Sequence, residues 1–168
     1  MVLRRRFTRA EHRAYERSNS LLEAGIAVDE LMRFQALSIE EGLERGDREK
    51  VRESCQELLR LLADAAEIEP PTFRLQDTAY AKFRGGRAVW KLYGTCAPDG
   101  TITVAYKTAV RRKVFAFLTF FDTVVHEFMH HFDARALRLA PSFHTRGFYL
   151  RVRSLRDSLL SDASAARG

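Results

Sequence analysis

The stretch TVVHEFMHHFD, residues 123–133, places ionisable side chains inside an otherwise apolar segment. Buried Glu, Asp and His side chains are costly unless a partner compensates them, and a metal ion is one such partner. His126 and His130 are four residues apart, so on a helix both imidazoles lie on one face, one turn apart. Glu127 lies about 100° round the same helix. The segment therefore predicts a helix that carries two metal ligands, with a carboxylate placed to hold a water molecule beside the ion.

The spacing His-Glu-x-x-His, residues 126–130, is the arrangement in which zinc lowers the pKa of water towards about 7 and the glutamate takes its proton. A catalytic zinc needs three protein ligands and an open position. No Glu follows Glu127, and the histidine of a longer version of this motif is replaced by Ala136. His144, just beyond Pro141, is the expected third ligand. The alternative is that His144 is an exposed loop or helix N-terminal histidine.

Three other side chains near the motif have competing interpretations. His131 points about 100° away from His130, so it is expected at the surface or in a supporting contact rather than on the ion. Asp133 is seven residues after His126 and returns to the metal face, where it either orients a ligand imidazole or pairs with an arginine. Cys96 could block the zinc as a thiolate, but a free cysteine more commonly packs as a small hydrophobe.

Hydrophobic periodicity predicts an α+β fold. From residue 8 to about 67 the pattern is helical, with breaks at Gly25, Gly42 and Gly46-Asp47; two or three helices are expected, one over residues 48–66 with Asp47 as its N-cap. Pro70-Pro71 ends the helical region.

Three runs with strand character follow the prolines, at residues 72–76, 87–93 and 101–107. The last two flank Gly94–Gly100, which contains Pro-Asp-Gly, and are expected to form a hairpin. Helix resumes from about 114 to 139, and a last helix follows His144. That helix is expected to bury five apolar side chains: Phe148, Leu150, Val152, Leu155 and Leu159. The predicted fold has N-terminal helices, a small three-stranded, mostly antiparallel sheet and two C-terminal helices.

Composition limits the class of protein. The chain has 168 residues, of which 46% are hydrophobic and 30% charged, as expected for one globular domain with or without an appendage. Two cysteines, Cys55 and Cys96, form no disulfide framework, so we expect free thiols. The arginine-rich start has no apolar region behind it, and the apolar run at 114–125 is too short to span a membrane. We therefore expect a cytoplasmic protein.

Charge is unevenly distributed along the chain. Residues 1–69 hold 12 Lys and Arg against 15 Asp and Glu, whereas residues 70–168 hold 16 against 7. A basic C-terminal half favours anionic partners, and nucleic acid is one candidate. A solvated, arginine-rich surface is the other interpretation.

The chain resembles the SprT-like zinc metallopeptidase domain, a family that includes the Spartan-type proteases acting on DNA–protein crosslinks. The resemblance is carried by the hairpin, by residues 123–133 and by SFHTRGFYLRV, residues 142–152. His126, Glu127 and His130 match the first family motif, and the spacing from His144 to Phe148 matches a later H-x-x-x-F. It departs where Thr145 replaces a frequent glycine, and it lacks the C-terminal zinc ribbon of many members.

The resemblance implies a zincin-like fold and a zinc-dependent endopeptidase. Zn²⁺ would be held by His126, His130 and His144, Glu127 would activate the zinc-bound water, and Tyr149 or Arg146 would stabilise the oxyanion. The implied partner is a peptide or protein substrate, which could pair with the edge of the sheet. The predicted organisation is a helical arm at 1–69, a peptidase core at 70–160 and a flexible tail at 161–168.

A non-catalytic zinc-containing module, associating with nucleic acid through the basic half, is the main alternative. A di-iron bundle would need a second E-x-x-H motif, and the chain has none.

Overall fold

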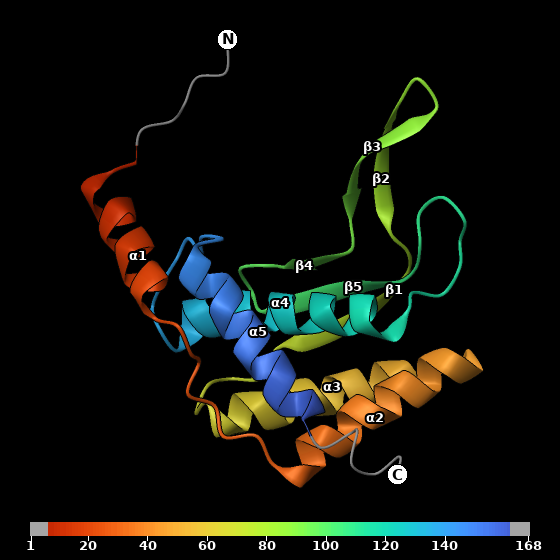
Figure 1. The fold of residues 1–168 in the computed structure, drawn as a ribbon, viewed down its shortest axis with the longest axis horizontal. Coiled ribbons are helices and arrows are strands. Elements are labelled where there is room, and N and C mark those ends of the chain that lie inside the picture. The colour runs from red at the N-terminus through yellow and green to blue at the C-terminus, as the bar shows by residue number, and fades with distance from the viewer. Residues whose placement is uncertain (1–6, 162–168) are drawn as a thin grey trace.

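The computed structural model describes residues 7–161, which form five helices and five strands (Figure 1). In chain order the elements are α1 (Arg9–Ser20), α2 (Glu30–Arg45), α3 (Arg48–Ala65), β1 (Thr72–Thr78), β2 (Tyr80–Arg84), β3 (Arg87–Leu92), β4 (Gly94–Cys96), β5 (Thr101–Lys107), α4 (Phe117–Arg135) and α5 (Arg146–Leu160). The predicted α+β class is confirmed. Of the flexible tail predicted at residues 161–168, residues 162–168 lie outside the described residues, as do residues 1–6.

The central sheet has the strand order β1-β5-β4. β5 runs parallel to β1 and antiparallel to β4, so the three-stranded sheet is mixed. β1 and β4 flank β5. Beyond the C-terminal end of β5, β2, which follows β1 in the chain, pairs with β3, which precedes β4. The resulting hairpin projects away from the body of the protein (Figure 1).

The predicted pairing of residues 87–93 with 101–107 is wrong. The segment Gly94–Cys96, placed in the turn by sequence reasoning, forms β4 and pairs with β5. The turn itself is shorter, because the Gly100 amide donates to the Ala97 carbonyl at 2.9 Å. β3 pairs instead with β2, a strand that sequence reasoning missed.

The turn of the β2–β3 hairpin explains this pairing. Gly85 and Gly86 have φ angles of 55° and 75°. A tight two-residue hairpin turn of type I′ needs positive φ at both central residues, and glycine adopts it without a steric penalty. The sequence Arg-Gly-Gly-Arg was therefore an available hairpin signal.

The N-terminal helices begin and end largely where their capping residues predict. Asp47 caps α3 by accepting from the Lys50 amide at 3.0 Å, and Gly46, in the left-handed region, ends α2. The break expected at Gly42 is wrong. Gly42 lies inside α2, where an added Cβ would be 2.8 Å from Val51 Cγ2, so the glycine permits close packing of α2 on α3.

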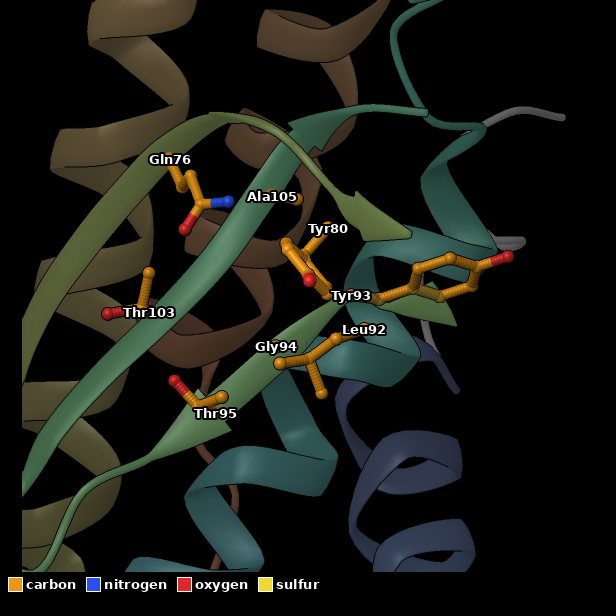
Figure 2. A pocket seen from close by; sticks show the side chains of 8 residues that line it. All are labelled: Gln76, Tyr80, Leu92, Tyr93, Gly94, Thr95, Thr103 and Ala105. Atoms are coloured by element: carbon orange, nitrogen blue, oxygen red, sulfur yellow. The ribbon is translucent and has the colours of Figure 1, made fainter. Parts of the chain in front are cut away.

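One hydrophobic core joins the N-terminal helices to the rest of the molecule. α3 packs on β1, and α2 packs on α4 and α5. Buried members of this core come from every layer: Ile39, Leu58, Leu62, Phe73, Ile102, Val125 and Phe148. The other face of the sheet carries Thr95, Thr103 and Ala105, which line a small pocket together with Tyr80 and Leu92 at the base of the hairpin (Figure 2). Helices α2 and α3 therefore complete the core.

The two C-terminal helices differ slightly from their predicted bounds. α4 begins at Phe117 rather than near 114, because the Phe115 amide still donates to the Tyr106 carbonyl beside the sheet. α5 buries Phe148, Leu155 and Leu159 as predicted, but leaves Leu150 and Val152 only half-buried. Among the described residues no helix is both long and apolar enough to cross a membrane. The cytoplasmic location stays a prediction.

Candidate metal centre

Three histidines converge at one point. His126 and His130 lie one turn apart on α4, and His144 lies in the loop before α5. Their Nε2 atoms are separated by 3.0 Å (His126–His144), 2.9 Å (His130–His144) and 3.2 Å (His126–His130). The three side chains could hold a metal ion between them. The sequence prediction that these three side chains come together is therefore confirmed.

The chemistry of this donor set fits a transition-metal ion. Burial, reinforced by the neighbouring imidazoles, lowers the pKa of His126 to about 4 and that of His130 to about 3. Both rings are therefore neutral at physiological pH, the state in which imidazole binds metals. Three nitrogens at about 2.1 Å from a tetrahedral zinc lie roughly 3.4 Å apart, close to the separations observed here.

A chain of buried polar groups fixes the orientation of His130. Ser142 Oγ lies 2.9 Å from His130 Nδ1 and donates its proton to Asp133 Oδ2 at 2.9 Å. Because the hydroxyl proton is committed to the carboxylate, Ser142 accepts the Nδ1 proton of His130. The imidazole is then held in the tautomer whose Nε2 lone pair faces the other two histidines.

Asp133 is in turn held by Arg151, whose Nη2 donates to both carboxylate oxygens at 3.0 and 2.9 Å. Both side chains are fully buried. The two alternatives for Asp133, orienting a ligand and pairing with an arginine, are therefore both realised, the first through Ser142. Arg151 was missed, although it is three residues after Phe148 and four before Leu155, on the buried face of α5.

Arg151 also ties the site to α1. Its Nη1 donates to the Ser18 carbonyl at 2.7 Å, and its Nη2 to Ser18 Oγ at 3.1 Å. Ser18 Oγ lies 3.0 Å from the hydroxyl of Thr145, which caps α5 directly after His144. A Cβ on Gly147 would lie 2.2 Å from the Ser18 carbonyl oxygen, so glycine is required for this close approach. The end of α1 thus supports the loop that carries the third histidine.

Glu127 lies beside the three histidines in a largely buried position, with 8% of its surface exposed. Burial raises the pKa of its carboxyl group to about 7. The β4 backbone approaches it closely at Gly94, where an added Cβ would be 2.9 Å from Glu127 Cγ and 2.7 Å from Thr123 Cγ2. Gly94 is a second position that sequence reasoning missed; a glycine inside a strand was the available signal.

A cleft of about 610 Å³ opens onto the site and is lined by the three histidines, Glu127 and residues of β4. Cys96 also lines it, but burial raises the pKa of the Cys96 thiol to about 11, so the thiol is protonated at neutral pH. Among the described residues, the group that could hold a metal consists of the three histidines without Cys96.

Comparison with known proteins gives no match. No family model, curated protein or solved structure is similar enough to the chain to identify it. The resemblance to the SprT-like domain stays a prediction based on the motif residues.

The remaining predicted site residues occupy different positions. Tyr149 stacks on the His144 ring, with centroids 5.7 Å apart and planes 29° apart, and is half-exposed. Arg146 is exposed on the first turn of α5. His131 is buried and lines the same cleft, but it is not one of the three converging histidines; its Nε2 donates to the Glu69 carbonyl at 2.8 Å.

Phe148 has a second role besides its place in the core. Its ring stacks on His130, with centroids 4.6 Å apart, and meets His126 edge to face at 5.0 Å. The apolar Phe148 ring therefore packs against the imidazoles of His126 and His130.

Proposed function

We propose that the protein is a zinc-dependent metallopeptidase that cleaves peptide bonds in a peptide or protein substrate. The observation that carries this proposal is the convergence of three imidazole Nε2 atoms next to the buried carboxyl group of Glu127, at the wall of an open cleft. The motif resemblance to the SprT-like domain supports the same reaction class.

His126, His130 and His144 would hold the zinc, leaving the cleft side open. When bound, zinc supplies a Lewis acid that polarises a carbonyl and increases the acidity of water. Glu127, whose pKa lies near neutral pH, takes a proton from the attacking water and delivers one to the leaving nitrogen.

The oxyanion requires a further hydrogen-bond donor. The Tyr149 phenol is the better-placed candidate because its ring is stacked on His144, which lines the cleft. Arg146, exposed on the same turn of α5, is the second candidate.

The position of β4 suggests how a substrate binds. β4 is an edge strand of the central sheet and lines the cleft beside Glu127. An extended peptide can add to such an edge through main-chain hydrogen bonds, which are independent of the peptide's side chains. We therefore propose an unfolded or extended segment of a protein as the substrate, with loose sequence preference.

The test combines metal content with hydrolysis of a fluorescein-labelled, unfolded protein. Wild type should carry about one equivalent of zinc and cleave the substrate. Glu127→Gln should keep the zinc and lose hydrolysis, whereas His144→Ala should lose the zinc. His12→Ala, at an exposed histidine on α1, is the matched control and should change neither. Full activity of Glu127→Gln would refute the mechanism.

A non-catalytic zinc-containing module is the second candidate function. It keeps the same three ligands but needs no general base. Wild type that binds one zinc and cleaves no substrate under any condition tested would favour it over the peptidase.

A further inference from the structure

The β2–β3 hairpin, residues 80–92, is here called the basic hairpin. It projects from the body of the protein (Figure 1). It exposes four large apolar side chains. These are Tyr80, Phe83, Val89 and Trp90, each about half-exposed. Large exposed apolar side chains gathered on one element indicate an interaction surface.

Aromatic rings and cations share one face of the basic hairpin. Strand side chains alternate between faces, so Tyr80, Lys82 and Arg84 lie on the same side of β2. Their partners on β3 are Leu92, Trp90 and Arg87, respectively; the odd spacing of Trp90 and Arg87 is accommodated by a register shift next to the Lys82–Trp90 pair, where β3 has one extra residue. The Tyr80 and Trp90 rings meet edge to face, with centroids 5.9 Å apart. This face therefore offers two aromatic rings with Lys82 beside them and two arginines towards the tip.

The cations on this face have no acidic partner. Arg84 lies directly opposite Arg87, and like charges in that position destabilise a strand pair. No Asp or Glu occurs between Asp77 and Asp99. Among residues 7–161, no ion pair involves a cation of the basic hairpin. An anionic ligand would relieve the repulsion between the two arginines.

The basic surface continues onto the loop after β5. Lys91 and Arg111 line one pocket of about 350 Å³ with Tyr93 and Thr108–Val110. Arg112 and Lys113 follow directly in the same loop and are exposed. The positive surface is therefore longer than the hairpin and can follow an extended polyanion.

We propose that the basic hairpin binds single-stranded nucleic acid. Bases would stack on Trp90 and Tyr80, while phosphates would contact Lys82, Arg84 and Arg87, the combination used by proteins that bind single strands without sequence preference. A duplex hides the faces of its bases and could not use the rings. A membrane is disfavoured because the tip is Arg84-Gly85-Gly86-Arg87, with the apolar side chains along the shaft. This binding goes beyond the proposed peptidase activity and does not depend on it.

Trp90 is the only tryptophan in the chain, so its fluorescence reports directly on the proposed site. The full-length protein is titrated with an oligothymidine of about 20 nucleotides, and binding is measured by tryptophan quenching and by anisotropy of the labelled oligonucleotide. We expect saturable quenching. Trp90→Ala should weaken binding measured by anisotropy about 5- to 150-fold, and Trp90→Phe should retain most of the affinity.

The charge contribution is tested separately by salt dependence. The double variant Arg84→Gln/Arg87→Gln should make the plot of log affinity against log salt less steep by about 1.4, since each phosphate contact on a single strand contributes about 0.7. The matched control is Arg9→Gln/Arg13→Gln, which removes the same charge from the exposed surface of α1 and should leave the slope unchanged.

Three results would overturn the proposal. One is affinity unchanged in both Trp90→Ala and Arg84→Gln/Arg87→Gln. Another is duplex DNA of equal length binding as tightly as the single strand. The third is a shift of Trp90 emission with phosphatidylserine vesicles or polyglutamate but not with the oligonucleotide, which would indicate a membrane or an acidic protein. Circular dichroism and metal content of each variant separate lost binding from lost folding.

Discussion

Replacing Ser142 with alanine tests whether the polar chain behind His130 supports the metal centre. The change removes two hydrogen bonds of 2.9 Å, one with His130 Nδ1 and one with Asp133 Oδ2. Asp133 keeps both bonds from Arg151, so no buried charge loses its partner and the fold should be retained. The main loss is the acceptor for the Nδ1 proton of His130.

The size of the effect follows from that lost acceptor. In the metal-free protein the His130 ring can turn or change tautomer, but with Nε2 on a metal its Nδ1 proton stays without a partner. An unsatisfied, partly buried donor costs about 1–3 kcal/mol, and each 1.4 kcal/mol is tenfold in affinity. Ser142→Ala should therefore weaken zinc binding about 10- to 100-fold, as supporting contacts behind metal-bound histidines commonly do.

Zinc affinity is measured by competition with a coloured chelator at neutral pH. Ser20→Ala is the matched control, because Ser20 Oγ donates to the Arg17 carbonyl at the exposed end of α1. The control should bind zinc as wild type does. If Ser142→Ala also binds within twofold of wild type, the polar chain does not set the orientation of His130 and the reasoning fails.

Three further predictions concern stability and the support of the site. Arg151→Met leaves the buried Asp133 carboxylate unpaired and should lower the free energy of unfolding by about 3–5 kcal/mol in urea denaturation; a loss below about 1 kcal/mol would contradict this. The Glu127 carboxyl has a higher pKa folded than unfolded, so it lowers the stability of metal-free protein as pH rises from about 4.5 to 7. The free energy of unfolding of Glu127→Gln should therefore rise by about 3 kcal/mol relative to that of wild type between those pH values. If the two curves of unfolding free energy against pH stay parallel, the raised pKa of Glu127 is refuted. Gly147→Ala, against the Ser18 carbonyl, should displace α1 and speed tryptic cleavage within it; unchanged cleavage would show that α1 is held elsewhere.

The three-histidine cluster could be predicted because the decisive signals are local. His126 and His130 are one helical turn apart, and their helix could be identified from its own periodicity. His144 could be predicted because a catalytic zinc needs a third ligand and because the chain offers no glutamate after Glu127. The N-cap at Asp47 is equally local, because its partner is the Lys50 amide three residues away.

Strand pairing and buried polar contacts could not be predicted from local signals in the sequence. β3 has strand character whichever neighbour it pairs with, and the choice depends on where β5 ends. Arg151 occupies a helical position that buries its side chain, but an arginine is normally assigned to solvent. Its burial is compensated by Asp133 and by backbone carbonyls at the end of α1, contacts that join distant segments.

The contact between Arg151 and Ser18 has a consequence for the order in which the protein assembles. The two residues are 133 positions apart in the chain, so a growing polypeptide cannot make this contact until residue 151 has been synthesised. Contacts between such distant segments form late because the intervening chain must first be ordered. His126 and His130 lie on one helix and come together without a distant contact. The contacts from α1 that support the loop carrying His144 are among the last to form. We therefore expect the metal centre to reach its final geometry only after the body of the protein has folded.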